Sequence, residues 1–353
     1  MIEKHANKTP IFILNWNGID DTIECLTSVF ELNDEEFFVI LMDNASDNDE
    51  GARLKQMYEN HPLVVIKQFD TNFGFCKAHI KAYEEFIASR TDIPYIALLN
   101  NDTIIDPNWL SELKKTAMEK NAHVVASKMI QYYNRNLMDN AGHWMLNTGE
   151  ILPIGHNESI DIHTKPAATL GACAGACLYD TDMIAEIGFY DPKFSTGYED
   201  AEYGLRAYLS GYSCVYCPSA IVFHKMGNSI KKVFNDEYST MIHSSILYTY
   251  FKLVPFKKMI FDIPSFLFKY SSMAVINLLF RRKKYMKVMI QSIKNTWKGR
   301  SEIRKNRKAY YGGRPNTPHL FALFSRITFF LWFDLKRFWS SIILNRDNSI
   351  DRY

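Results

Sequence analysis

Two phosphate-binding signatures are missing from this sequence. No Gly-x-Gly-x-x-Gly turn follows any of its apolar segments, and no Gly-Lys-Ser or Gly-Lys-Thr loop occurs. The first signature brings backbone against the pyrophosphate of a dinucleotide, and the second cradles phosphates in P-loop proteins. Their absence argues against both classes, so a cation and side chains must handle the phosphates of any bound nucleotide.

The sequence also has no stretch that resembles a secretory signal. Its first apolar run, Ile11–Leu14, is far too short for one and is followed by Asn-Trp-Asn. We therefore expect a cytosolic protein whose 6 cysteines stay reduced. The spacings Cys173–Cys177 and Cys214–Cys217 suggest zinc, but both pairs lie in apolar or small-residue runs, where free cysteine packs as a small hydrophobe. We favour packing over a zinc site.

Each part of the chain is poor in charge of one sign. From Lys252 to the end there are 22 Lys and Arg but only 5 Asp and Glu, a net charge of +17. The preceding part has 19 basic and 34 acidic residues, a net charge of −15. The overall charge of +2 hides this division, which predicts two regions with different roles, the basic one facing something anionic.

Apolar runs of strand length alternate with helical patterns in the N-terminal part. The predicted strands are Pro10–Leu14, Phe37–Met42, Leu63–Lys67 and Tyr95–Leu99. Between them, the segments with apolar residues at helical spacing are Asp20–Leu32, Gly51–Asn60 and Cys76–Ser89. This alternation favours an α/β fold of the Rossmann-like kind, a mostly parallel sheet with helices on both faces.

Three of these strands end in amides or acids, namely Asn15, Asp43 and the run Asn100-Asn101-Asp102. The carboxyl ends of parallel strands meet at one edge, where open α/β sheets bind ligands. An acid beside two amides at that edge suits a hard cation and, through it, a diphosphate. The alternative is an ordinary turn, because Asn and Asp favour turns.

The following part of the chain is less regular. Helix Trp109–Lys120 and strand His123–Gln131 precede a loose segment, Tyr132–Thr169, which we interpret as an acceptor-side insertion. The run Leu170–Tyr179 is rich in Gly, Ala and Cys, so it permits close approach of backbone to a ligand or a neighbour.

Acids open a further predicted helix at Glu199 and Asp200. Acids in a first turn suit the helix dipole, but one carboxylate there would also serve as a general base. Glu202 and Arg206, four residues apart, are most simply a surface ion pair. His224 ends a predicted strand, where a lone histidine is more often a hydrogen-bonded core residue than a ligand.

Together these features resemble the family 2 glycosyltransferases with the GT-A fold, especially inverting bacterial enzymes of surface polysaccharide synthesis. The matching stretches are Ile11–Gly18, Met42–Asp47, Asn72–Ala78, Leu98–Asp106, Gly171–Tyr179, Ile187–Phe194 and Glu199–Arg206. Each is weak alone, but all of them occur in the family's order.

The resemblance implies a nucleotide-sugar site. Asp43 would hydrogen-bond the base, while Asn15 and Asn72 would frame the nucleoside, with Gly74 in the turn that follows Asn72. His79 departs from the family pattern, in which an asparagine is common at this position. That departure leaves the donor contacts of this turn open.

The resemblance also implies a metal site. Asn100-Asn101-Asp102 is similar to the Asp-x-Asp motif, with Asp102 as the main ligand for Mn²⁺ or Mg²⁺ on the donor diphosphate. Asn100 replaces the first acid, so Asn100 and Asn101 would contact the donor without adding charge. His224 stands where related enzymes complete the metal site.

By the same resemblance Asp200 is the catalytic base, with Glu199 beside it for support or acceptor binding. A single base on the acceptor side gives in-line attack and inversion at the anomeric carbon. A retaining double displacement would need a second carboxylate as nucleophile, and no further acid stands out in these motifs.

The basic C-terminal region interleaves aromatic residues with Lys and Arg. Neither Phe266–Phe280, which is short and contains Lys269, nor Phe321–Ile343, which contains four charges, reads as a spanning helix. We expect helices that lie on an anionic membrane surface, the alternative being a subdomain that packs on the core or in a homodimer. Arg300–Lys308 suggests nucleic acid, but no upstream module supports it, and we expect none.

We therefore predict a GT-A catalytic domain at residues 1–250, with a nucleotide-sugar half at about 1–130 and an acceptor half at about 131–250, and a helical membrane-associating or oligomerising region at 251–353. The predicted reaction is metal-dependent, inverting transfer from dTDP-rhamnose, or next from a UDP-hexose or UDP-N-acetylhexosamine, to a glycan or polyprenyl-linked glycolipid. The expected location is the inner face of the cell membrane. Two alternatives are a non-catalytic sugar-nucleotide-binding scaffold and a sugar-phosphate nucleotidyltransferase, although Asn15–Asp20 lacks the Gly-rich basic loop of the latter.

Overall fold

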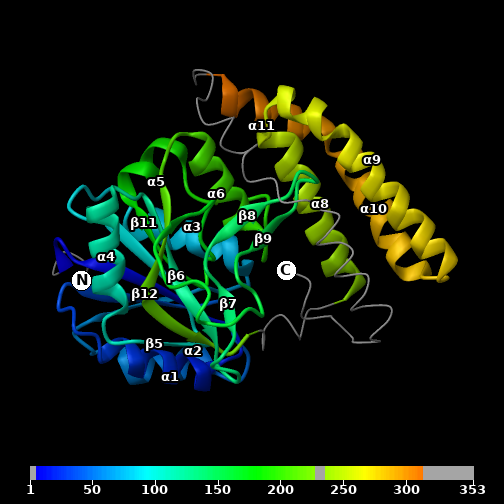
Figure 1. The fold of residues 1–353 in the computed structure, drawn as a ribbon. Coiled ribbons are helices and arrows are strands. Elements are labelled where there is room, and N and C mark those ends of the chain that lie inside the picture. The colour runs from blue at the N-terminus through cyan, green and yellow to red at the C-terminus, as the bar shows by residue number, and fades with distance from the viewer. Residues whose placement is uncertain (1–4, 227–234, 313–353) are drawn as a thin grey trace. The chain divides into compact units, whose positions relative to one another are not determined.

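The computed structural model of the chain describes residues 5–226 and 235–312, so the predicted tail segment Phe321–Ile343 lies outside the described residues. The chain forms two compact units, Met1–His143 with Pro153–Lys232, and Trp144–Leu152 with Val233–Tyr353. The first unit holds a large sheet flanked by helices, and the second is mainly helical (Figure 1).

The first unit is built on a 10-stranded mixed sheet. Its strands are β1 (Thr9–Asn15), β2 (Phe37–Asp43), β3 (Val64–Gln68), β4 (Tyr95–Asn100), β5 (Thr103–Ile105), β6 (Val124–Gln131), β7 (Met138–Asn140), β10 (Ala167–Ala168), β11 (Ala176–Asp180) and β12 (Cys214–His224). The helices are α1 (Ile19–Phe30), α2 (Glu50–Tyr58), α3 (Gly74–Phe86), α4 (Trp109–Lys120), α5 (Thr181–Ile187) and α6 (Glu199–Leu209). The strand order is β10-β12-β6-β11-β4-β1-β2-β3, with β5 joined to β12 and β7 to β6.

Alternate side chains of β1 face two different helical layers. Ile11 and Ile13 belong to a core cluster that includes Leu26 of α1 and Trp109 of α4. Phe12 points the other way, and its ring lies 6.3 Å from that of His79 in α3. A strand covered on both sides must be apolar on both sides, which is why the predicted strands read as unbroken apolar runs. The predicted α/β class, with helices on both faces of a mostly parallel sheet, is confirmed.

Strand direction changes after β4. β1 pairs in parallel with β2 and β4, and β2 with β3, whereas β11 runs antiparallel to both of its neighbours, β4 and β6. The sequence predicted an ordered run in this region but not its direction, because an apolar run is the same in either orientation. The insertion of β11 places its start beside the end of β4, where the predicted site lies.

Close backbone packing holds α6 against the segment before β11. A Cβ atom added to Gly171 would lie 2.7 Å from the Cα of Gly204, a distance that real Cβ atoms essentially never show. Two glycines therefore face each other at this contact, and the predicted close approach in the run Leu170–Tyr179 is confirmed.

The predicted surface ion pair between Glu202 and Arg206 is wrong, because both side chains are buried. Arg206 Nη2 lies 3.0 Å from Glu202 Oε2. The remaining guanidinium hydrogens are donated to the backbone carbonyls of Ile187, Gly188 and Phe189. The pair thus fastens α6 to the end of α5, a role that helical spacing alone does not distinguish from a solvated pair.

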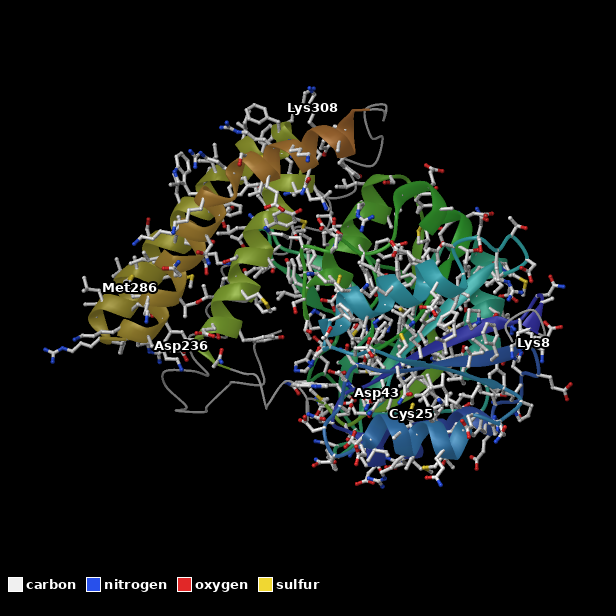
Figure 2. The ribbon with its side chains drawn as sticks, turned by 180° about the vertical axis from the view of Figure 1, so that it is seen from behind. Lys8, Cys25, Asp43, Asp236, Met286 and Lys308 are labelled. Carbon is white, nitrogen blue, oxygen red and sulfur yellow. The ribbon has the colours of Figure 1, made fainter. Side chains whose placement is uncertain are left out.

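The second unit consists of helices and one hairpin. The hairpin strands are β8 (His143–Met145) and β9 (Ile151–Pro153), and the helices are α8 (Asp236–Leu253), α9 (Phe256–Leu279), α10 (Lys283–Lys298) and α11 (Arg300–Tyr311). Figure 2 marks Asp236 in α8, Met286 in α10 and Lys308 in α11. Hydrogen bonds from Ser292 of α10 to the Thr240 carbonyl and from Asn306 of α11 to the Tyr248 hydroxyl join both helices to α8.

Helix α9 is longer than the sequence suggested. It runs unbroken for 24 residues, through both Pro264 and Lys269, and by length and composition it could cross a bilayer. Only 11% of its most apolar window is buried within the structure. The core helix of a soluble protein can pass the same test of length and composition, so the test alone does not place α9 in a membrane.

Candidate active site

The polar ends of β1 and β2 are joined by hydrogen bonds. Asn15 and Asp43 are register partners on neighbouring parallel strands, and the Asn15 amide donates to Asp43 Oδ1 at 2.8 Å. The same amide lies within hydrogen-bond distance of Ser46 Oγ and Glu50 Oε2, at 3.0 and 3.1 Å. Sequence reasoning missed Ser46 and Glu50, although the polar run that follows β2 was a signal for them. The structure therefore brings two predicted nucleoside residues together at one sheet edge.

The turn before α3 is fixed by a pair of asparagines. Asn44 donates to Asn72 Oδ1 at 2.9 Å, and the same oxygen accepts from the Gly74 backbone at 2.7 Å. Gly74 has a φ of +71°, and a Cβ there would lie 2.7 Å from Ser195 Oγ. Only glycine suits this position. The turn brings Asn72 within hydrogen-bond distance of Asn44, which follows β2.

His79, the departure from the family pattern, is a buried residue of α3 whose ring lies 6.3 Å from that of Phe12 in β1. Its Nδ1 lies 2.8 Å from the Phe75 carbonyl, and its ring centroid lies 4.1 Å from that of Phe75, with the two rings tilted by 36°. Burial lowers the pKa of His79 to about 4, so the ring is neutral at physiological pH. Packing therefore accounts for this histidine.

Asn100, the last residue of β4, and Asn101, which follows it, contact different neighbours. Asn101 donates to Thr22 Oγ1 of α1 at 2.9 Å and thereby ties the loop to that helix. The Asn100 backbone donates to the Gly175 carbonyl at 2.8 Å. The structure thus places Asn100 beside the turn that enters β11 and Asn101 beside α1.

His224, at the end of β12, lies between two carboxylates. Its Nε2 is 3.2 Å from Asp102 Oδ1, and its Nδ1 is 2.7 Å from Asp139 Oδ2. His156 Nδ1 lies 3.3 Å from the other oxygen of Asp139. Burial opposes a charge on His224, but the two carboxylates outweigh burial and raise the pKa of His224 well above its ordinary value. The two predicted metal ligands, Asp102 and His224, therefore lie next to each other.

Sequence reasoning missed Asp139 and His156. Both belong to the loose segment that was interpreted as an acceptor-side insertion, where the strands are only 2 or 3 residues long. Such strands have no measurable periodicity, so the sequence contained no signal for either residue.

The donor set at this edge fits a divalent cation that a substrate helps to hold. In residues 5–226 and 235–312 no cluster of three His, Cys, Asp or Glu side chains could hold an ion alone. Asp102 and His224 supply one carboxylate and one imidazole nitrogen. Asp139 hydrogen-bonds the second ring nitrogen of His224, the arrangement that orients most metal-binding histidines. Phosphate oxygens and water would complete the coordination.

Asp200 opens α6 and faces the turn before β11. Its Oδ2 accepts a hydrogen bond from the Ala174 backbone at 3.0 Å, and its Oδ1 accepts from the Ala201 backbone at 2.7 Å. His143 Nε2 lies 3.9 Å from Oδ2. The side chain keeps 17% of its surface exposed, so a ligand can reach a carboxylate that two backbone amides hold in place.

Glu199 differs from its neighbour in environment. It is buried, and among the described residues its Oε2 has no hydrogen-bond partner. Burial, and secondly the charge of Asp200, raises the pKa of Glu199 to about 8. Glu199 therefore carries a proton near neutral pH. Two adjacent carboxyl groups in such different surroundings are suited to different roles.

One short turn connects the predicted metal side with the predicted base. Asn100 donates to the Gly175 carbonyl, and Ala174, one residue earlier, donates to Asp200. The pairing of β11 with β4 inside the sheet, in which Ala176 opposes Leu99, fixes the position of this turn. The end of β4 and the start of α6 thus share one support.

Comparison with known proteins gives a family and a fold. The model of the Glycosyl transferase family 2 matches residues 11–188. The O-antigen biosynthesis protein RfbC of Myxococcus xanthus is 25% identical over 200 residues, which are 53% of this chain but only 15% of that protein. The match therefore spans a small part of the relative's length.

Two solved structures are similar in fold. Residues 1–349 of TarS from S. aureus, in complex with UDP-GlcNAc, give a TM-score of 0.55 at 16% identity, with 81% of each chain covered. GalNAc-T7 with UDP, GalNAc and Mn²⁺ gives a TM-score of 0.57 at 13% identity, covering 70% of this chain and 48% of that one. The predicted GT-A fold is confirmed by these likenesses.

Proposed function

The chain belongs to glycosyltransferase family 2, and on that basis we propose that it transfers a sugar from a nucleoside-diphosphate donor to a hydroxyl group of a glycan or polyprenyl-linked glycolipid. The observation that carries the proposal is the turn at Ala174 and Gly175. It supports both Asp200 and the strand end that leads into Asp102. Sugar transfer requires ligands for the metal that binds the donor and a base for the acceptor. The turn at Ala174 and Gly175 holds both close together.

On the donor side, Asn15, Asp43 and Asn72 would contact the nucleoside, while Asp102 and His224 would hold Mn²⁺ or Mg²⁺. When bound, such a cation stabilises the negative charge that develops on the leaving nucleoside diphosphate. Asp139 holds the ring of His224 so that Nε2 faces Asp102. The structure of GalNAc-T7 with UDP, GalNAc and Mn²⁺, which is similar in fold, supports this assignment.

On the acceptor side, Asp200 would take the proton of the attacking hydroxyl group. The amides of Ala174 and Ala201 hold its two oxygens, so the carboxylate meets the acceptor in a fixed orientation. Glu199 holds its proton and adds no second charge beside the base. One base and no second nucleophile correspond to inversion at the anomeric carbon.

The donor sugar and the location are the finer parts of the proposal. We propose dTDP-rhamnose as donor because of the motif resemblance, with UDP-linked hexoses and N-acetylhexosamines as the competitors to test. The match to an O-antigen biosynthesis protein supports a role in surface polysaccharide synthesis, at the inner face of the cell membrane. The basic second unit would contact that membrane, and a homodimer through the same unit is the competing arrangement.

Thermal shift against a panel of dTDP- and UDP-sugars, with and without Mn²⁺, tests the donor side. A ligand that binds only the native state must stabilise it, so we expect a metal-dependent rise for one nucleotide series. Asp102→Asn should abolish the metal-dependent part, and Asp106→Asn, at a half-buried acid that follows β5, is the matched control. No shift with any nucleotide in the presence of Mn²⁺ would favour a function other than sugar transfer.

A further inference from the structure

Helix α9 has its polar residues inside and its apolar residues outside. Lys258 and Asp262 are only 1% and 2% exposed, and Lys269 is also buried. On the outer face, Leu267 and Leu278 are 64% and 74% exposed. A helix at the surface of a protein in water normally shows the opposite arrangement.

The buried charges of α9 are paired within the second unit. Lys258 Nζ lies 2.6 Å from Asp262 Oδ2, and the Tyr250 hydroxyl donates to the same oxygen at 2.8 Å. Lys269 Nζ lies 2.5 Å from Glu150 Oε2 in the hairpin. Because every one of these charges has its partner on the inner side, the exposed residues of α9 are apolar apart from Lys257 in the first turn and Ser271. Helices surrounded by lipid place their ionisable residues in this way.

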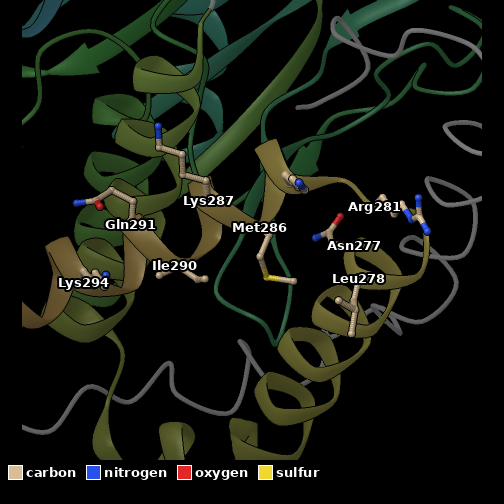
Figure 3. A pocket seen from close by; sticks show the side chains of 9 residues that line it. Asn277, Leu278, Arg281, Met286, Lys287, Ile290, Gln291 and Lys294 are labelled. Atoms are coloured by element: carbon tan, nitrogen blue, oxygen red, sulfur yellow. The ribbon is translucent and has the colours of Figure 1, made fainter.

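A pocket of about 630 Å³ lies between the last turn of α9 and α10. Figure 3 shows its side chains arriving from both helices, with Leu278 on the α9 side and Met286 on the α10 side. Four cations line it, namely Arg281, Lys283, Lys287 and Lys294. In the described part of the chain none of the four has a carboxylate partner, whereas the neighbouring Lys284 lies 2.7 Å from Asp236.

We propose that this pocket binds the phosphate-bearing head group of an anionic membrane lipid, whose acyl chains lie along the outer face of α9. Uncompensated cations beside Leu278 and Met286 match a phosphate attached to hydrocarbon, because each pocket wall combines charge with apolar surface. The apolar face of α9 continues away from the pocket through Leu267 to Phe256. A bilayer leaflet is the partner that offers phosphate groups at its surface, to meet the pocket, and hydrocarbon beneath them, to meet the apolar face of α9.

The inference deepens the membrane contact of the proposed function, yet it is independent of sugar transfer and is tested separately. We would measure sedimentation of the full chain with vesicles of phosphatidylcholine and with vesicles in which about one third of the lipid is phosphatidylglycerol. The expected result is binding to the anionic vesicles. Lys283→Glu with Lys287→Glu should weaken it by at least about tenfold, because two attractive charges become repulsive.

The matched control is Lys115→Glu with Lys120→Glu, a charge reversal of equal size at two exposed lysines of α4. It should leave vesicle binding within about twofold of the unsubstituted chain. Equal losses in both double variants would mean that only the net charge matters, and would overturn a specific pocket. Saturable binding of inorganic phosphate by the pocket without any binding to vesicles would overturn the lipid assignment.

The outer face of α9 has its own test. The Leu267→Cys variant is labelled with an environment-sensitive dye. The fluorescence of this dye should be quenched by lipids that carry a quencher in their acyl chains. The unsubstituted chain, whose cysteines are buried or half-buried, measures the background labelling. A label shielded from both water and lipid, or a dimer that Leu267→Asn dissociates, would show that protein covers this face and would overturn the proposal.

Nucleotide binding measured on the same samples separates the two proposals. Loss of vesicle binding with intact nucleotide binding contradicts only the lipid site. Intact vesicle binding by a chain that binds no nucleotide contradicts only sugar transfer.

Discussion

His224 Nε2 and Asp102 Oδ1 lie 3.2 Å apart, although the two residues are far apart in the sequence of the first unit. The contact exists because β5, directly after Asp102, pairs antiparallel with the end of β12, where His224 opposes Thr103. Asp139 holds the opposite nitrogen of the ring at 2.7 Å. The orientation of His224 therefore depends on a residue from the irregular insertion.

We predict that Asp139→Asn weakens metal-dependent nucleotide binding by about 10-fold to 100-fold, the usual effect of losing the partner of a metal-binding histidine. The measurement is a Mn²⁺ titration in the presence of the nucleotide, followed by thermal shift. Asp161→Asn, at an exposed acid of the same insertion, is the control. An unchanged Mn²⁺ midpoint in Asp139→Asn would contradict a metal role for His224.

For the base, Asp200→Asn should lower kcat by about 10²-fold to 10⁴-fold, the range expected for loss of a general base. Nucleotide affinity should stay within a factor of about two, because the acceptor base is not expected to contact the nucleotide and the amide still offers one oxygen to one of the two backbone donors. Steady-state transfer and nucleotide titration on the same sample check both statements. A loss confined to nucleotide affinity would place Asp200 in donor binding instead.

Glu199 should make the stability of the protein depend on pH. Its folded pKa of about 8 is above that of an unfolded glutamate, so the folded chain holds the extra proton between these values. The stabilising effect of this proton is complete below the unfolded pKa and is lost as the pH rises through about 8. Glu199→Gln should therefore match the wild type near pH 5 and be more stable near pH 9 by a few kcal/mol, on the order of the shift.

The measurement is urea unfolding of both proteins at several pH values, compared as a difference so that other titrating groups cancel. Glu186→Gln, at an exposed acid of α5, supplies the reference for an unspecific change of charge. A difference between Glu199→Gln and wild type that does not vary with pH would show that Glu199 is ionised in the folded protein.

The buried pair of α6 gives a prediction about stability. Arg206→Met should destabilise the protein by about 3–5 kcal/mol, because it leaves the Glu202 carboxylate buried without a cation. It also leaves three carbonyl groups at the end of α5 without their donor. The double variant Glu202→Met with Arg206→Met should recover part of the loss, as measured by chemical unfolding. Equal losses in the single and double variants would mean that the carbonyl contacts dominate.

The sequence predicted the parallel half of the fold well because buried strands and amphipathic helices leave opposite patterns. Helix α4 was predicted with the bounds Trp109–Lys120 that the structure shows, and the ends of β1 and β2 were located by Asn15 and Asp43. The same rule failed for β11, because a short apolar run does not encode its direction, and for Glu202 and Arg206, because spacing does not encode burial.

Within the candidate site, the residues at strand ends were predictable and the residues that support them were not. Asp102 and His224 follow apolar runs, which drew attention to both. Asp139 and His143 lie on strands of only 3 residues, where no period exists. Their positions depend on pairing with distant strands, which a local pattern does not contain.

The turn at Ala174 and Gly175 has a consequence for how this enzyme can change in evolution or in the laboratory. Because one peptide segment supports both Asn100 and Asp200, any shift of its backbone alters two functions at once. Substitutions there should be strongly non-additive with substitutions at either site. We therefore expect changes of donor preference to arise more readily at Asn72, whose side chain contacts Asn44 and Gly74, than in this shared support.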